Sequence, residues 1–346
     1  MSRPKVAVLM TTPESVTEDY SRLLNLVSFG EVLPPGQDVF LAVDLTWHHF
    51  FPSCSTPPWQ LDGIIHELLN IGYSADSIHA CYNKTTGVTV KKGEILNRQR
   101  IVLEKHGAHI CHTGEDARWT VHHPGKPLRV LGNIYPGGIP VPDRYINSPV
   151  IYLPTMKTHH TAIIAGALYS AFESILNEKR IRAHAQIHDA LADTLVLLKE
   201  LHPGMLAVMD GAFAGDGCGP RRLRPHITNV IAASQDPLAL DAVTASMMGF
   251  DPLAIPFIRI AHEAGLGTGD IQEIELLGDD ISGMNFQFRV DPTPVDTLLG
   301  KLERTAPGSH LSMLYHDWYW YIAAGEPRIK QVMKSQWWKL FESYRK

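Results

Sequence analysis

The chain has 346 residues, 45% hydrophobic and 19% charged, which is enough for one large α/β domain or two smaller ones around an apolar core. Its formal net charge is −5 and it has no long run of Lys or Arg, which argues against nucleic acid as a partner and favours small molecules. No stretch approaches the roughly 18 consecutive apolar residues of a membrane span, and the N-terminal apolar run is too short for a signal peptide, so we expect a soluble cytoplasmic protein without a membrane partner.

In the first half of the chain, short apolar runs alternate with helical patterns. Nearly continuous apolar runs are typical of strands that are buried on both faces, and spacings of three and four indicate amphipathic helices. The segment between residues 109 and 143 is rich in Pro and Gly and predicts an insertion with short strands (TVHH, PLRVLG). The predicted strands are 5–10, 38–45, 77–83 and 150–154, and the helices are 20–28, 59–73 and 93–108.

In the second half, residues 205–211 and 227–234 predict strands on either side of a glycine-rich loop, 210–222. Ser234 or Asp236 should cap the next helix, and Gly265 or Gly267 should close the one after it. Residues 271–280 predict a last strand, and the tail from Pro292 predicts aromatic helices.

The order of strands and helices predicts an α/β fold, a mostly parallel sheet flanked by helices, doubly wound and Rossmann-like. We expect an α/β core domain over residues 1–290, with two lobes meeting near 110–150 as one arrangement, and a helical aromatic C-terminal extension over 291–346. The density of Trp and Tyr in the extension suits a homodimer interface, a lid or packing on the chain's own core.

The segment 153–191 concentrates the residues that can carry chemistry. Lys157, His159 and His160 follow a strand that Pro154 ends, and a helix over 162–176 should begin after Thr158 or Thr161. A helix N-terminus beside a lysine favours an anion, so we expect a substrate carboxylate or phosphate here. Lys157 and His159 are candidate catalytic residues, and His160 should point elsewhere.

Four residues between positions 159 and 210 could hold a metal ion. His184 and His188 are four positions apart, which on an α-helix puts both rings on one face. Together with His159 and the strand-end Asp210, they predict a site for a divalent transition metal, iron or zinc. Two solvated histidines on an exposed helix face are the alternative.

Two loops at strand ends add further candidates. Asp44, His48 and His49 follow the second strand, where α/β folds place ligands, although a surface loop with packed aromatics is the alternative. Asp44 and Asp210 are candidate catalytic carboxylates, and Arg221 and Arg222 could hold a substrate anion.

Several cofactors are not expected. The cysteines Cys54, Cys81, Cys111 and Cys218 form no C-x-x-C pair, so we predict no iron–sulfur cluster and no disulfide framework. No G-K-[ST] ends the glycine-rich loop, and the GLGTGD segment follows a helix, so no nucleotide cofactor is predicted.

The order of several motifs resembles the family called domain of unknown function 362. These motifs are LPTMKTHH, HAQIHDALAD, LAVMDGAFAGDGCGP and IAASQDPLALDAVTASMMGFDP. The resemblance implies pocket roles for Lys157, His159, His188, Asp210, Gly219, Pro220, Asp236 and Asp241. Leu168, Tyr169 and Ser170 stand where the family commonly has Leu-Lys-Asn, and Ala42, Val43 and Asp44 stand where it has Lys-Pro-Asn. Tyr169, Ser170 and Gly219 are therefore expected to contact the substrate of a specialised member without a ferredoxin module.

These observations predict a metal-dependent enzyme that acts on a small anionic substrate, as an oxygenase, a hydrolase or a lyase. A metal-free isomerase or lyase that uses His and Lys as acid and base is the first alternative. A non-catalytic ligand-binding descendant of an enzyme family is the second.

Overall fold

The fold is built on one large mixed sheet. The computed structural model describes residues 3–85, 87–292, 294–302 and 306–345, without the side chains of residues 295–297, 306 and 309. The main path of the sheet runs β12-β1-β11-β10-β7-β2-β3-β4, and β8 and β9 extend it beside β10. The strands of this sheet are β1 (Lys5–Met10), β2 (Val39–Val43), β3 (Ile78–Tyr82), β4 (His109–His112), β7 (Val150–Leu153), β8 (Thr155–His159), β9 (Ile163–Ile164), β10 (Met205–Cys218), β11 (Arg222–Ser234) and β12 (Glu275–Gly278).

Along the main path, all neighbouring strands are parallel except where β11 takes part. β11 pairs antiparallel with both β1 and β10, whereas β10, β7, β2, β3 and β4 form a continuous parallel block. The predicted mostly parallel α/β sheet is confirmed. Because the carboxyl ends of the parallel strands lie at one edge, the loops that follow β2, β3 and β7 meet there.

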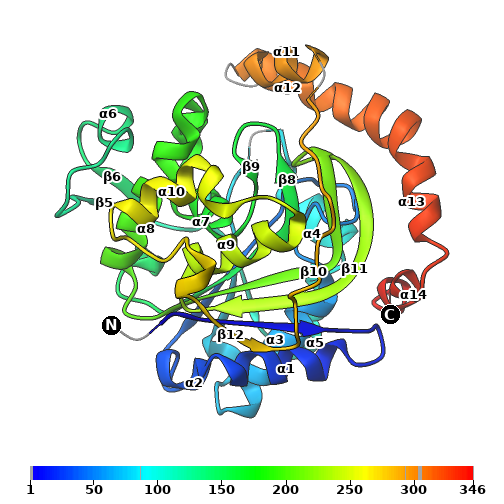
Figure 1. Ribbon diagram of the computed structural model, residues 1–346, viewed down its shortest axis with the longest axis horizontal. Coiled ribbons are helices and arrows are strands. Elements are labelled where there is room, and N and C mark those ends of the chain that lie inside the picture. The colour runs from blue at the N-terminus through cyan, green and yellow to red at the C-terminus, as the bar shows by residue number, and fades with distance from the viewer. Residues whose placement is uncertain (1–2, 86, 293, 303–305, 346) are drawn as a thin grey trace.

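Helices cover both faces of the sheet, as Figure 1 shows. One face packs under α1, α3 and α5, and the other under α7, α8, α9 and α10. The α-helices are α1 (Val16–Leu26), α2 (Phe29–Val32), α3 (Pro58–Asn70), α4 (Val90–Leu96), α5 (Gln99–His106), α6 (Leu131–Ile134), α7 (Ala167–Ile175), α8 (Ile187–Leu201), α9 (Pro237–Met248), α10 (Pro256–Glu263), α11 (Pro294–Leu302), α12 (Ala306–Tyr315), α13 (Glu326–Val332) and α14 (Gln336–Ser343).

The segment predicted as a glycine-rich loop is a strand. β10 continues through Gly211 and Gly215 to Cys218 and turns directly into β11, which makes the long hairpin at the right of the sheet in Figure 1. Glycine is required because a Cβ at Gly215 would collide with Ser53, and one at Gly219 with the backbone of Thr158. The prediction of a loop was wrong because these close approaches are tertiary and leave no local signal.

The helix predicted over 162–176 begins later than expected. After Pro154 the chain continues as β8, turns back as β9, and enters α7 only at Ala167. The carboxylate of Asp241 accepts hydrogen bonds from the backbone N–H groups of Ala167 and Leu168, at 2.5 and 3.0 Å. The N-terminus that was expected to hold a substrate anion is therefore occupied by a carboxylate of the chain itself.

Two predicted helix boundaries are confirmed. Asp236 caps α9 and accepts hydrogen bonds from the backbone N–H groups of Leu238 and Ala239. Gly265 follows the end of α10 with a φ of +64°, the left-handed conformation that favours glycine at this position.

The segment between β4 and β7 contains a two-stranded antiparallel sheet of β5 (Trp119–His122) and β6 (Ile139–Pro142). The TVHH strand is confirmed, but PLRVLG forms no strand and enters α6 instead.

The C-terminal helices run along the outer side of the β10–β11 hairpin (Figure 1). Met313, Ile329, Val332, Trp337 and Phe341 of this region belong to the same apolar cluster as α1 and α3. A π-helix, His316–Gly325, connects α12 to α13. No helix among the described residues is long and apolar enough to cross a membrane.

Candidate functional site

The loop after β2, residues 44–56 (the β2 loop), is mostly buried, and hydrogen bonds join its first and last residues. The Thr56 N–H donates to the Asp44 carbonyl at 2.9 Å, and the Thr56 hydroxyl accepts from the Asp44 N–H at the same distance. Thr56 also donates to the Leu153 carbonyl of β7, at 2.7 Å. The β2 loop is thus fixed to the carboxyl end of the parallel block, as expected for a functional loop on a rigid scaffold.

A buried ion pair between Lys157 and Asp44 stabilises this loop. The Lys157 ammonium donates to Asp44 Oδ2 at 2.5 Å, to the Cys54 carbonyl at 2.9 Å and to Thr155 Oγ1 at 2.8 Å. The two charged side chains are 2% and 8% exposed. An ammonium has three donors, so all of them are used within the protein. Lys157 and Asp44, each a candidate catalytic residue from the sequence, form an ion pair that positions the β2 loop.

Arg221 approaches the same loop from the β10–β11 turn. Its Nε donates to the Thr46 carbonyl at 3.1 Å, and the Thr46 hydroxyl donates to Asp44 Oδ1 at 2.8 Å. The side chain of Arg221 is buried and lines a cleft beside the loop. The hairpin end and the β2 loop are therefore one connected polar structure.

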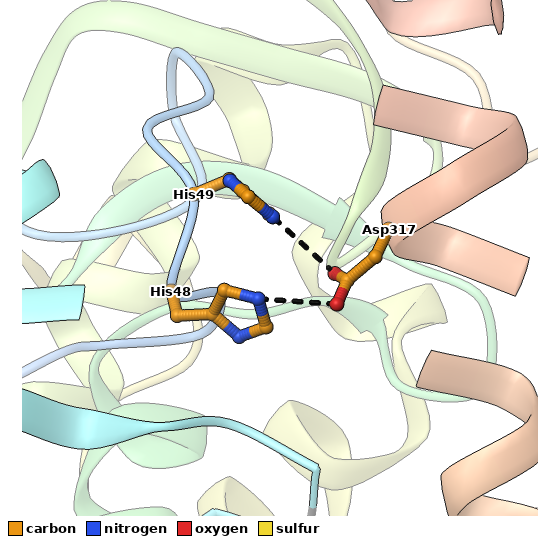
Figure 2. Close-up of side chains that lie close together, drawn as sticks. All are labelled: His48, His49 and Asp317. Carbon is orange, nitrogen blue, oxygen red and sulfur yellow. Dashed lines mark ion pairs between the residues drawn. The ribbon is translucent and has the colours of Figure 1, made fainter. Parts of the chain in front are cut away.

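The β2 loop carries two adjacent histidines that face one aspartate, as Figure 2 shows. His48 Nε2 lies 3.1 Å from Asp317 Oδ2, and His49 Nε2 lies 3.8 Å from Asp317 Oδ1. Trp47 Nε1 donates to Asp317 Oδ1 at 2.9 Å. Among the described residues, His48, His49 and Asp317 are the one group of three His, Cys, Asp or Glu side chains with ligand atoms within 4.8 Å of one another.

The surroundings of this histidine–aspartate cluster favour neutral imidazoles. Burial lowers the pKa of His48, against the attraction of Asp317. Burial and the neighbouring His48 lower the pKa of His49 to about 4. Both rings are therefore neutral near pH 7, which is the form in which imidazole binds a metal ion. Two histidines and one carboxylate are a ligand set for iron(II) and for zinc, with positions left for substrate or water.

Aromatic rings pack around the cluster. His49 stacks on Tyr321 with ring centroids 4.3 Å apart, and Trp47 packs edge to face on His316 and Tyr321. Asp317, His316 and Tyr321 belong to the π-helix, a form of helix that occurs frequently at functional sites. The indole of Trp47 fixes the carboxylate through its hydrogen bond, and would orient Asp317 if that residue bound a metal ion.

A small cleft opens beside the cluster, between the hairpin end and the C-terminal helices. It contains two arginines and two histidines, so its electrostatic character suits an anion. His160 is fixed at its edge by a 2.8 Å hydrogen bond between Nδ1 and the Gly219 carbonyl. The lining residues are His160, Cys218, Gly219, Pro220, Arg221, Arg222, Leu299, Gly300 and His316.

The predicted substrate-binding residues lie in two places, at the cleft and on α7. Arg221, Arg222 and Gly219 line the cleft, and Arg222 also donates to Cys218 Sγ at 3.4 Å. Tyr169 and Ser170 lie instead on α7, where both are buried.

His159 is buried next to His160, which lines the cleft. It is 1% exposed, and its Nδ1 accepts hydrogen bonds from the Thr161 and Ala162 N–H groups, both at 3.2 Å. Its ring lies 4.7 Å from that of His160 and 4.4 Å from that of Tyr169. Burial lowers the pKa of His159 well below its usual range, so this ring too is neutral.

His184 and His188 belong to different elements. His184 lies in the 3₁₀ helix Glu178–Gln186, and α8 begins at Ile187, so the expected single α-helical face is not formed. His184 Nε2 lies 3.3 Å from the Tyr169 hydroxyl, and His188 stacks on Phe257. The structure brings His159 and His184 around Tyr169 but does not gather the four predicted ligands within one coordination distance.

Asp210 faces α1 and α3. Its Oδ2 accepts hydrogen bonds from the Tyr20 hydroxyl at 2.8 Å and from Trp59 Nε1 at 2.7 Å. Burial raises the pKa of this carboxyl to about 6. Asp210 thus joins the helical layer to β10.

Two carboxylates near the site were not singled out from the sequence. Asp317 is the one acidic residue in the aromatic stretch YHDWYWY, and Glu173 stands alone in the apolar helix α7. Burial raises the pKa of Glu173, and the neighbouring Asp44 raises it further. A lone carboxylate within an apolar or aromatic stretch is the signal that could have identified both.

Comparisons with known proteins place the chain in context. The family model described as "Domain of unknown function (DUF362)" matches residues 84–246. The thylakoid-associated protein sll1697 of Synechocystis sp. (strain ATCC 27184 / PCC 6803 / Kazusa) is 28% identical over 120 residues, which are 34% of this chain and 37% of that relative. The chain thus matches little more than a third of this relative's length. The family match includes Lys157, Asp210 and Arg221 and excludes the histidine–aspartate cluster.

Proposed function

We propose that this chain, whose residues 84–246 belong to the domain of unknown function 362 family, is a metal-dependent enzyme that acts on a small anionic substrate. The observation that carries this proposal is the convergence of His48, His49 and Asp317, with both imidazoles neutral, beside a cleft that contains two arginines. The proposed ion is iron or zinc, and it would act as a Lewis acid or activate water or dioxygen.

The proposed metal site differs from the one that the sequence predicts. His48, His49 and Asp317 lie outside residues 84–246, whereas Lys157 and Arg221, which support the β2 loop, lie inside. A specialised member of the family would keep the family's scaffold and carry metal ligands outside the matched residues, as His48, His49 and Asp317 would be here. Arg221 and Arg222 are the proposed holders of the substrate anion, as a carboxylate or a phosphate.

Metal content tests the proposal directly. We expect about one equivalent of iron, zinc or cobalt per chain after chelation and reloading, measured by inductively coupled plasma mass spectrometry. Asp317→Ala and His48→Gln should lose the ion and the d–d absorption of the cobalt form. His159→Ala is the matched control, because it removes a sequence-predicted ligand outside the cluster and should retain the ion.

Two outcomes would overturn this function. A wild-type chain that keeps its fold and binds less than about a tenth of an equivalent of any of these metals would exclude the metal site. Loss of the ion from His159→Ala, with retention in Asp317→Ala, would return the site to the predicted ligands His159, His184 and His188. Thermal shifts with small carboxylates and phosphates, followed by mass spectrometry for conversion, then separate catalysis from binding.

A metal-free mechanism that uses Lys157 as the base has less support. The ammonium is 2% exposed and uses its three donors on Asp44, Cys54 and Thr155. A general base must reach the substrate proton within hydrogen-bond distance, and Lys157 faces the β2 loop instead.

We further propose that the C-terminal helices mediate a homodimer. Leu311, Leu314, Trp318 and Ile322 are between 58% and 70% exposed and are spaced three and four positions apart, so they form one apolar side. Leu314→Asp should shift the mass in light scattering from dimer to monomer. Leu276→Asp on β12 is the matched control, since Leu276 is also exposed and lies outside these helices. A monomeric wild type would contradict the dimer.

The cytoplasm is the location that we propose. The four cysteines are free thiols, which is typical of a reducing compartment. The Synechocystis relative is named for an association with thylakoids, so cell fractionation should compare the soluble and membrane fractions. Recovery in a membrane fraction at high salt would contradict the proposal.

A further inference from the structure

Strands β3 and β4 carry the same short pattern, His-x-Cys, in register. His79 pairs with His109, and Cys81 pairs with Cys111, across these parallel strands. Because side chains two positions apart on a strand point to the same face, the four side chains share one face of the sheet. The two thiols are 3% and 5% exposed.

Cys111 has the surroundings of an activated thiol. Arg144 Nη1 donates to Cys111 Sγ at 2.6 Å, and the imidazole of His79 lies beside the same sulfur. His79 Nε2 in turn lies 3.4 Å from Asp38 Oδ2. A guanidinium and an imidazole beside a thiol are the surroundings that activate a cysteine nucleophile.

The two thiols are not equivalent. The hydrogen bond from Cys81, together with Arg144 and His79, lowers the pKa of Cys111 below its usual range. The hydrogen bond to Cys111 and burial raise the pKa of Cys81 well above its usual range. Cys111 is therefore the more acidic thiol of the pair and lies next to a potential resolving cysteine.

We propose that Cys111 is a peroxide-reactive thiolate and that Cys81 resolves its oxidised form into a disulfide between β3 and β4. In the first step the Cys111 thiolate attacks hydrogen peroxide, the O–O bond breaks, and sulfenic acid and hydroxide form. In the second, the Cys81 sulfur attacks the sulfenic sulfur, and the S–O bond breaks with loss of water as the thiol proton leaves. The sulfurs are oxidised and the peroxide is reduced; a dithiol such as dithiothreitol reverses the change.

The strand geometry permits this bond. Neighbouring strands lie about 4.8 Å apart, within the range of about 4.4–6.8 Å between the Cα atoms of disulfide-bonded cysteines. Because both thiols have low exposure, which restricts large oxidants, we propose hydrogen peroxide, a small one. None of these residues belongs to the histidine–aspartate cluster or the cleft, so the inference is independent of the proposed function.

The test is oxidation of the metal-free full chain with one equivalent of hydrogen peroxide at pH 7. We expect the intact mass to fall by two hydrogens, with peptide mapping that assigns the bond to Cys81 and Cys111. Cys81→Ser should instead accumulate a sulfenic acid on Cys111 that dimedone traps. Cys111→Ser should give neither product. Cys54→Ser is the matched control and should behave as wild type, because burial raises the pKa of Cys54 to about 12.

Arg144→Met provides a variant that keeps both thiols. Without the guanidinium the pKa of Cys111 should rise, and the rate of disulfide formation at pH 7 should fall about tenfold. Absence of the disulfide from the oxidised wild type, a bond that involves Cys54 or Cys218, or an unchanged rate in Arg144→Met would each overturn the proposal. Circular dichroism and thermal midpoints verify that every variant is folded, and Cys111→Ala replaces Cys111→Ser if that variant is not.

Discussion

Two groups of histidines lie near the carboxyl end of the sheet, and they differ in where their partners come from. His159 and His184 take theirs from the surrounding segment: the backbone N–H groups of residues 161 and 162, and Tyr169. His48 and His49 face Asp317, a carboxylate of the C-terminal π-helix. The first group is satisfied locally, whereas the second is completed only when the C-terminal helices are in place.

This difference indicates which group is free to bind an ion. A ring nitrogen that accepts backbone N–H groups is occupied as a ligand atom, as at His159 Nδ1. Neutral rings that share a single carboxylate can exchange that contact for metal coordination with little rearrangement. His159 and His184, from the histidine-rich segment, are therefore held by local contacts. His48 and His49 of the β2 loop form the stronger candidate metal site.

The largest effect should come from breaking the support beneath the β2 loop. Lys157→Met leaves the buried Asp44 without its cation, so the free energy of unfolding should fall by about 3–5 kcal/mol in urea denaturation. The double variant Lys157→Met/Asp44→Leu should recover part of that loss, since neither charge then remains buried. A fall of less than about 1 kcal/mol in the single variant, as for an exposed pair, would contradict the positioning role.

A second effect should appear at Asp210, as a dependence on pH. Burial raises the pKa of Asp210 from 3.8 to about 6, so its contribution to stability is complete below pH 4 and is lost as the pH rises to about 6. The loss amounts to roughly 3 kcal/mol. Asp210→Asn should remove this decline relative to wild type and leave metal binding unchanged.

Asp241, a second buried carboxyl with a raised pKa, does not obscure that measurement. Burial raises the pKa of Asp241 to about 7, with the same sign, but its contribution is present in both proteins and cancels in the difference. Parallel stability curves for wild type and Asp210→Asn between pH 4 and 6 would contradict a raised pKa. Loss of metal from Asp210→Asn would instead support the ligand role that the sequence predicts.

Most of the fold follows from local patterns. The apolar runs at β1, β2, β3 and β7 predicted buried parallel strands because residues covered on both faces need no polar alternation. The β10–β11 hairpin was missed because its glycines reflect tertiary contacts with Ser53 and Thr158. The delayed start of α7 was missed because its capping carboxylate, Asp241, is on another helix.

The candidate site could be predicted only in part. The sequence places His48 and His49 in a loop at a strand end, and it places Lys157 and Arg221 near ligands. It cannot supply Asp317, because Trp47 and Asp317 are separated by 270 positions and no periodicity joins them. The spacing of His184 and His188 predicted a shared face, and the change from 3₁₀ to α geometry between them removed it.

A smaller effect should come from the indole that orients Asp317. Trp47→Phe removes the hydrogen bond to Asp317 Oδ1 but keeps an aromatic ring against His316 and Tyr321. Metal affinity should fall by about 10- to 100-fold in a competition titration, as for other outer partners of metal ligands. Trp59→Phe is the matched control, because its indole donates to Asp210. Equal affinities in Trp47→Phe and wild type would mean that Asp317 does not bind the ion.

The smallest change in stability and metal affinity is expected for a substitution at His184. His184 lies in a 3₁₀ helix, is half-buried and contacts the Tyr169 hydroxyl at 3.3 Å. His184→Ala should lower the free energy of unfolding by less than about 1 kcal/mol, the range of a single neutral hydrogen bond. Metal affinity should stay within about twofold of wild type, whereas His49→Ala should lose far more, since both rings are half-buried but only His49 faces Asp317. A large loss of metal affinity in His184→Ala would show that His159 and His184 can exchange their present hydrogen bonds for metal coordination. The ion would then bind at His159 and His184 instead of at His48, His49 and Asp317.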